Sequence, residues 1–276
     1  MRGTTIARLR AAGCVFADEE AEILLSAATT PADLDAMCRR RESGEPLEHI
    51  VGWAGFGELR LAVGPGVFVP RQRSLLLARA AVAAAREHSE PVVLEAFCGV
   101  APIGATIRAT VPGAAVHVAD RDATALSYAR RNVGTRVEVH HGDGFGALPA
   151  RLRRRVTVIT AVPPYVPEAA HGLLPHEAVD HEPPAALFAG ADGLDRIVEL
   201  VHGAGDWLAD AGVLLIEMTA AQAETMTTSA SPSTAGRPGD TGRWWVPAGC
   251  VEHDDGRTVV AAFTRPGDHR RSGPAR

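Results

Sequence analysis

Short apolar runs alternate with longer amphipathic segments along most of the chain after residue 90. Such runs predict strands buried on both faces, and the segments between them have the helical spacing of apolar positions. Strands are predicted at residues 92–94, 115–119, 137–139, 156–161, 213–217 and 259–263, and helices at 103–109, 123–132 and 194–208. This alternation predicts an α/β fold, a parallel sheet with helices on both faces.

The chain before residue 90 has a different pattern. Three acidic residues at 18–20 suit the first turn of a helix, and Thr30 followed by Pro31 is typical of the start of another. Between Pro46 and Pro70, apolar residues separated by turn residues predict a β-hairpin or two short strands. An apolar, alanine-rich helix is predicted at residues 75–85.

The last part of the chain is less regular. Residues 226–242 are rich in Ser, Thr, Pro and Gly and are interpreted as a flexible loop, and the residues from Arg265 as a disordered tail. The pair Trp244-Trp245 fits either a partner-binding patch or packing of the last strands on the sheet.

Composition narrows the function class. The 276 residues are 46% hydrophobic and 22% charged, which suits a globular protein with a sizeable core. The net charge of −5 argues against a protein that grips nucleic acid through its phosphates. Every cationic side chain is Arg, which excludes a catalytic lysine. The chain shows no signal-peptide core or membrane-length apolar run, so a cytoplasmic location is expected.

The spacing of Cys and His residues does not suggest a metal site. The four cysteines are scattered without a CxxC pair. His171, His176 and His181 recur at intervals of five, which does not place them on one helical face. An ordinary polar loop is the favoured interpretation of this segment, and no metal is expected.

The loops that follow the predicted strands carry the candidate chemistry, because ligands of open α/β sheets bind outside the carboxyl ends of the strands. The turn at residues 95–104 is rich in small residues, which lets backbone approach a nucleotide-like ligand. Asp120 ends the next strand and can accept both ribose hydroxyls. Asp143 and Gly144 follow the third strand and can flank an adenine ring.

A second motif follows the fourth strand. Val162-Pro163-Pro164-Tyr165 contains two prolines that fix a rigid, extended turn. Tyr165 offers a flat face on which a planar group can stack. Taken alone, this segment could also be a plain proline-rich strand exit.

Together these motifs resemble the bacterial release-factor glutamine N5-methyltransferases, in particular an actinobacterial subgroup of unknown substrate. The resemblance covers most of the chain. It includes the segments 46–52 and 63–71, which are similar to the family's linker, and Glu182-Pro183 with 187–195, which are similar to a segment beyond its catalytic turn.

The resemblance implies a class I AdoMet-methyltransferase sheet of the Rossmann-like type, with S-adenosyl-L-methionine as cofactor. It implies a helical domain at residues 1–45, a β-hairpin linker at 46–74, the methyltransferase domain at 75–267 and a tail at 268–276. The implied cofactor-binding residues are Glu95, Phe97, Cys98, Gly99, Val100, Ala101, Asp120, Arg121, Asp143 and Gly144. The implied catalytic turn is Val162, Pro163, Pro164 and Tyr165, and Phe68, Arg71 and Tyr165 are implied to bind the acceptor.

Several positions depart from the family pattern. Val162 stands where the family has the Asn whose oxygen accepts an N–H of the substrate amide, and valine accepts no hydrogen bond. Glu95 replaces an Asp, Phe97 and Ala101 replace small residues or glycine, Thr157 replaces an Asp, and Gln72-Arg73-Ser74 replaces Pro-Glu-Thr. The resemblance therefore leaves two alternatives for the chain's function.

The first is an active methyltransferase whose acceptor is held at the turn 162–165 and is not a simple primary amide. Val162 suits a less polar acceptor, such as a secondary amine, a hydroxyl or a small metabolite, and a protein of the release-factor type also stays open. The other is a degenerate member that binds a ligand or partner without catalysis. A nucleic-acid amino methyltransferase is disfavoured because the sequence shows no basic groove or target-recognition domain.

Overall fold

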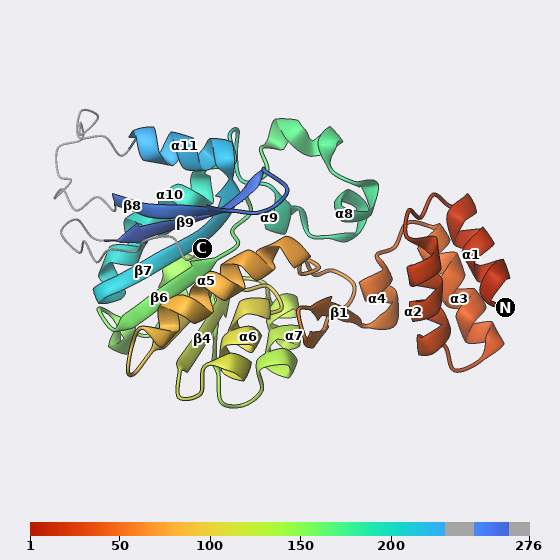
Figure 1. Cartoon of the computed structure of the whole chain (residues 1–276), viewed down its shortest axis with the longest axis horizontal. Coiled ribbons are helices and arrows are strands. Elements are labelled where there is room, and N and C mark those ends of the chain that lie inside the picture. Colours follow the sequence, from red (N-terminus) through yellow and green to blue (C-terminus); the bar gives the residue numbers. More distant parts are fainter. Residues whose placement is uncertain (230–245, 265–276) are drawn as a thin grey trace.

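The computed structural model describes residues 1–229 and 246–264, without the side chains of 229 and 246–248. Most of the predicted flexible loop, the Trp244-Trp245 pair and the predicted tail lie outside the described residues. Figure 1 shows a sheet with flanking helices at one end of the molecule and a small group of N-terminal helices at the other.

A seven-stranded sheet in the described part of the chain has the order β5-β4-β3-β6-β7-β9-β8. Its strands from β5 to β7 pair in parallel, and β9 is antiparallel to both β7 and β8. The strands are β3 (Val92–Ala96), β4 (Ala115–Asp120), β5 (Glu138–His141), β6 (Val156–Ala161), β7 (Leu208–Thr219), β8 (Val246–Glu252) and β9 (Thr258–Thr264). The predicted strands are confirmed, and the antiparallel edge adds to the parallel sheet that was expected.

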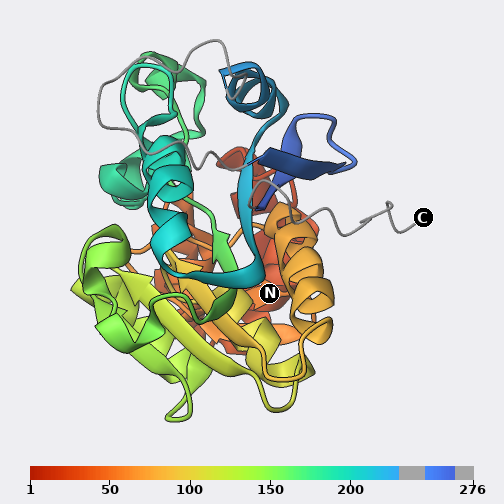
Figure 2. The same cartoon turned by 90° about the vertical axis from the view of Figure 1, so that its left-hand side faces the viewer.

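Helices cover both faces of the sheet, as predicted. Figure 2 shows α5 and α10 on opposite sides of β7. Buried side chains of α5 (Leu75–Arg86), α6 (Pro102–Thr110) and α7 (Ala123–Val133) form one core with one face of the sheet. Those of α10 (Asp195–Gly203) form a second core with the other face, on which α11 (Ala220–Ser229) also packs.

The N-terminal helices have a core of their own. They are α1 (Arg2–Ala11), α2 (Ala17–Ala27) and α3 (Pro31–Glu42), and their buried side chains pack with Ile50 of α4 (Leu47–Val51). The predicted cap is confirmed, since the Thr30 hydroxyl accepts the Asp33 N–H at 3.1 Å. The side chain of Arg41 joins these helices to the rest of the chain by pairing with Glu177 at 3.1 Å. The division at residue 45 stays a prediction.

The predicted boundaries were wrong in three places. Residues 47–51 of the expected hairpin segment form α4, and the hairpin is limited to β1 (Trp53–Phe56) and β2 (Leu59–Ala62). The helix predicted at 194–208 ends at Gly203 and is followed by a 3₁₀ turn, so Leu208 already belongs to β7. Helix α11 occupies the beginning of the predicted loop, up to residue 229.

Short helices complete the described chain between these elements. They are α8 (His176–His181), α9 (Pro184–Leu187) and the 3₁₀ helices η1 (Gln72–Ser74), η2 (Gly144–Ala147), η3 (Ala150–Leu152), η4 (Glu168–Leu173) and η5 (Ala204–Asp206). The segment from η4 to α9 follows β6 and, together with the residues around η1, covers the carboxyl ends of the central strands.

Candidate functional site

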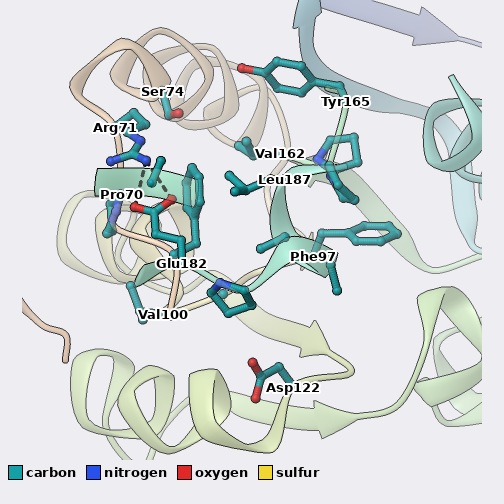
Figure 3. Close-up of a pocket in the computed structure, with 18 of the residues that line it drawn as sticks. Pro70, Arg71, Ser74, Phe97, Val100, Asp122, Val162, Tyr165, Glu182 and Leu187 are labelled. Carbon is teal, nitrogen blue, oxygen red and sulfur yellow. Dashed lines mark hydrogen bonds and ion pairs between the residues drawn. The ribbon is translucent and has the colours of Figure 1, made fainter. Parts of the chain in front are cut away.

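A cavity of about 380 Å³ lies at the carboxyl ends of β3, β4 and β6. Its walls come from the loops after these strands, from the residues around η1, and from the segment that contains α8 and α9 (Figure 3). Most of the residues predicted for the site line it: Phe68, Arg71, Glu95, Phe97, Cys98, Gly99, Val100, Asp120, Arg121, Val162, Pro163, Pro164 and Tyr165. The topology therefore brings both sequence motifs to one place.

Glu95 at the end of β3 fixes the loop that follows. Its carboxylate accepts the N–H of Ile103 at 3.1 Å and that of Gly104 at 2.6 Å, which caps the start of α6. Burial raises the pKa of Glu95 to about 8, and these two hydrogen bonds act in the opposite direction. Pro102 is the first helical residue, where its missing N–H costs the helix no bond. Glu95 thus positions the loop through the helix.

The loop itself has an unusual backbone. Phe97, Gly99 and Ala101 all have left-handed φ angles, of 51°, 53° and 62°. Two of these residues carry a Cβ, which makes this conformation unfavourable for them. The Phe97 ring packs against the second core, which α10 forms with one face of the sheet, and lies beside the Arg196 guanidinium. In Figure 3 it points away from Val162 and Glu182, so it leaves the hollow of the cavity open.

Asp120 lies at the end of β4, against the cavity. One carboxylate oxygen accepts the Gly99 N–H at 2.8 Å, and the other accepts the Asp122 N–H at 2.9 Å. Burial raises the pKa of this carboxyl, and the two N–H donors oppose the shift. Asp122 caps α7 by accepting the N–H of Thr124 at 2.7 Å. The carboxylate of Asp120 is therefore held rigidly at the cavity wall.

Three residues predicted to bind the cofactor do not line the cavity. Ala101 is fully buried as the residue before α6. Asp143 and Gly144 lie outside the lining, and the Asp143 carboxylate instead pairs with Arg196 of α10 at 3.2 Å. In this conformation the Asp143 side chain forms that ion pair and does not face the cavity.

The proline turn ends β6 next to a buried acid. Ala161 pairs with Ile216 in the sheet, so the residues that follow them, Val162 and Glu217, are neighbours. The Tyr165 hydroxyl donates to the Glu217 carboxylate at 3.2 Å. Burial and this anion raise the pKa of Tyr165 to about 12, so its hydroxyl stays protonated near neutral pH.

Backbone contacts fix Tyr165 from the other side. Gln222 of α11 donates to the Tyr165 carbonyl at 2.9 Å and to the Asp192 carbonyl at 3.3 Å. Gly193 has a φ of 77°, and a Cβ there would collide with the same Tyr165 carbonyl. Gln222 was not predicted as a site residue, because nothing local in α11 indicates its distant partner.

An ion pair closes the cavity on the side of the linker. One nitrogen of the Arg71 guanidinium lies 2.7 Å from both oxygens of Glu182, drawn as dashed lines in Figure 3. Glu182 is almost fully buried and also accepts the Val69 N–H at 3.3 Å. The Arg71 guanidinium lies over the Phe68 ring, 4.7 Å from its centroid. Arg71 therefore joins the linker to the segment beyond the turn.

Arg73 and Ser74 were noted in the sequence only as departures from the family pattern, but both line the cavity. Arg73 Nε lies 3.6 Å from Glu217 Oε1. Within the described residues, Arg73 Nε and Glu217 Oε2 are buried without a hydrogen-bond partner. Burial raises the pKa of Glu217, and Arg73 and Ser74 oppose the shift. An ion pair between the buried Glu217 carboxylate and the partly exposed Arg73 side chain thus lies beside the tyrosine of the turn.

The chain is similar in sequence to curated methyltransferases. It is 39% identical over 193 residues to the release factor glutamine methyltransferase of Streptomyces coelicolor, over 67% of this chain and 68% of that protein. It is 38% identical to the release factor glutamine methyltransferase of Mycolicibacterium smegmatis, over 62% of this chain and 61% of that one. No family model matches the chain.

Another relative has a different name. The chain is 36% identical to the 4-amino-L-phenylalanine/4-methylamino-L-phenylalanine methyltransferase of Streptomyces pristinaespiralis, over 65% of this chain and 63% of that protein. Proteins named for different substrates therefore share this sequence similarity.

A solved structure shares the fold. The hMettl16 catalytic domain, in complex with the MAT2A 3′UTR hairpin 6, matches with a TM-score of 0.53 at 12% identity, over 84% of this chain and 80% of that one. At this identity the match shows the fold alone. Together with the strand order, it confirms the predicted Rossmann-like methyltransferase sheet.

Proposed function

Because the chain belongs to the release factor glutamine methyltransferase family, we propose that its cavity transfers a methyl group from S-adenosylmethionine to an acceptor held against Val162 and Tyr165. The enzyme class and the cofactor follow from the family. The acceptor and the roles of single residues belong to the proposal, which depends most on the position of the Asp120 carboxylate beside the proline turn in one cavity.

The residues around Asp120 fit an adenosine group. Each carboxylate oxygen already accepts one backbone N–H, and each has a second acceptor site that a ribose hydroxyl can occupy. Gly99 has no Cβ, so backbone can approach the ligand closely there, and the Phe97 ring is turned aside (Figure 3). The cofactor, when bound, supplies an activated methyl group on a positively charged sulfur.

The side chain of Val162 restricts the kind of acceptor that can bind. A primary amide has two N–H bonds to satisfy, and the valine side chain can accept neither. Burying one N–H without a partner costs about 1–3 kcal/mol, or roughly a factor of 5–150 in binding. We therefore propose an acceptor with fewer N–H bonds than a primary amide, such as a secondary amine or a hydroxyl group of a small molecule.

The names of the relatives are consistent with an amine as the acceptor. Two are named for a glutamine of a release factor, and one is named for a primary and a secondary aromatic amine. The ring of Tyr165 supports a planar acceptor, because its hydroxyl is anchored on Glu217 and its carbonyl on Gln222. An acceptor stacked on this ring would be oriented before the methyl transfer, which is the main contribution expected of such a site.

The degenerate, non-catalytic member is not supported by these relatives, all of which are named as methyltransferases. A protein acceptor and the lack of a nucleic-acid partner stay predictions, as does the cytoplasmic location. Among the described residues, no helix has the length and apolar character needed to cross a membrane.

The test is methyl transfer from labelled S-adenosylmethionine to two acceptors, 4-methylamino-phenylalanine and a glutamine-containing peptide. We expect the wild type to prefer the amine, and Val162→Asn to shift the ratio of kcat/KM values toward the peptide at least tenfold. Val162→Ala is the matched control, because it removes bulk without adding an acceptor oxygen. A wild type that prefers the peptide, with an unchanged ratio in Val162→Asn, would refute the proposed acceptor class.

A further inference from the structure

Three side chains that can ligate a metal gather on one face of β4 and β5. His117 Nδ1 lies 3.1 Å from His140 Nε2, and Glu138 Oε2 lies 4.0 Å from His117 Nδ1. One ligand atom from each of the three residues lies within 4.8 Å of the others. None of the three is among the described residues that line the cavity, so the cluster is separate from the methyl-transfer site.

The strand register explains why these residues meet. His117 pairs with Glu138, and Ala119 pairs with His140, in the parallel ladder between β4 and β5. Side chains two residues apart on a strand point to the same face, so Glu138 and His140 lie on the face that carries His117. The pairing of β4 with β5 therefore places the three side chains close together.

The surroundings suit a partly open site. His117 is buried, His140 is half-buried and Glu138 is exposed at the edge strand. The two rings are stacked, with centroids 5.3 Å apart and planes 21° apart. Burial lowers the pKa of both histidines, which keeps their nitrogens neutral near pH 7 and able to bind a cation.

We propose that His117, His140 and Glu138 bind a divalent cation of the zinc class, with water completing the coordination. Zn–N bonds of about 2.0–2.1 Å in a tetrahedral site separate two nitrogens by roughly 3.3 Å, close to the separation found here. Two imidazoles and one carboxylate favour Zn²⁺, Ni²⁺ or Cu²⁺ over Mg²⁺ or Ca²⁺. Glu138 must move closer by about 1 Å, which a rotation of its side chain can supply.

Two local interactions must give way when the cation binds. Without an ion, one of the facing ring nitrogens donates a hydrogen bond to the other, so that ring must lose this proton or move it to its other nitrogen. The Glu138 carboxylate also pairs with the exposed guanidinium of Arg151, which competes with the cation. Bound metal would link the edge strand β5 to β4, and this would stabilise the sheet by mass action.

Calorimetric titration of the full chain with Zn²⁺, and the visible absorption of the Co²⁺ complex, test this site. We expect one ion per chain, at least tenfold weaker binding in His140→Ala, and tighter binding in Arg151→Ala, which frees Glu138. His88→Ala is the control, since it removes a histidine that does not belong to the cluster and should leave Zn²⁺ binding unchanged. Because His117 is buried, His140→Ala and Glu138→Gln are the informative variants, and their folding is checked by circular dichroism.

The proposal is overturned if the wild type binds no Zn²⁺ at millimolar concentration. It is also overturned if His140→Ala binds as tightly as the wild type, which would place the ion elsewhere. Neither result depends on methyl transfer, so this site and the proposed function are tested separately.

Discussion

The effect of Gly99→Ala on stability should come from the left-handed backbone at this position. A Cβ added at Gly99 meets no atom within 4 Å, so Gly99→Ala introduces no steric clash with neighbouring groups. With φ at 53°, alanine costs about 1–2 kcal/mol in this conformation. Alanine also restricts the backbone of the unfolded chain, which offsets about 0.4–1 kcal/mol of this cost. We therefore expect a net loss of about 1 kcal/mol in the free energy of unfolding.

Urea unfolding measures this loss, and a matched variant separates stability from binding. Gly113→Ala has the same features, with φ at 89° and no atom within 4 Å of the added Cβ, but it precedes β4, at the opposite end of the strand from the cavity. Both variants should lower the melting temperature by about 2–4 °C. Only Gly99→Ala should also weaken S-adenosylmethionine binding, because Gly99 lines the cavity and the added methyl group takes up space beside the ligand. Equal affinity in the two variants would refute this role for the loop.

Three further substitutions test the surroundings of the site. Glu95→Gln should remove a pH dependence of the free energy of unfolding. Folding raises the pKa of this acid to about 8, so the wild type loses stability relative to the variant as pH rises from about 4.5 to 8. Unfolding curves across this pH range would show the loss. Gly104→Ala places a Cβ 2.7 Å from Val118 Cγ1 and should cost about 1–3 kcal/mol; full wild-type stability would contradict this packing. Gln222→Ala leaves the Tyr165 carbonyl without this donor and should cost about 1–3 kcal/mol, measured by urea unfolding, whereas a neutral effect would count against the contact.

The sheet could be predicted because its central strands are buried on both faces and are therefore mostly apolar. The cavity could be predicted because parallel strands place their following loops at one edge, which brought Asp120 and Val162 together. The error at the end of α10 has a local cause. Apolar positions continue to Leu208 with helical spacing, but the chain turns after Gly203 and Leu208 enters β7.

Interactions between distant parts of the chain could not be predicted in the same way. Asp143 follows β5 as expected, yet its carboxylate pairs with Arg196 of a helix that lies 53 residues further on. Glu217 is buried next to Val162 only because β7 pairs with β6, and the sequence of β7 alone suggests an ordinary apolar strand. Tertiary pairing decides such contacts, and a single sequence contains no local signal for it.

The claim on which the rest depends is that the hollow beside Asp120 holds the adenosine part of S-adenosylmethionine. Isothermal titration with this cofactor, on the wild type and on Asp120→Asn, tests it most directly. We predict one molecule bound per chain, and at least tenfold weaker binding in the variant, because an amide presents only one acceptor oxygen to the ribose hydroxyls. Absence of binding to the wild type at millimolar cofactor, or equal affinity in both proteins, would contradict the account.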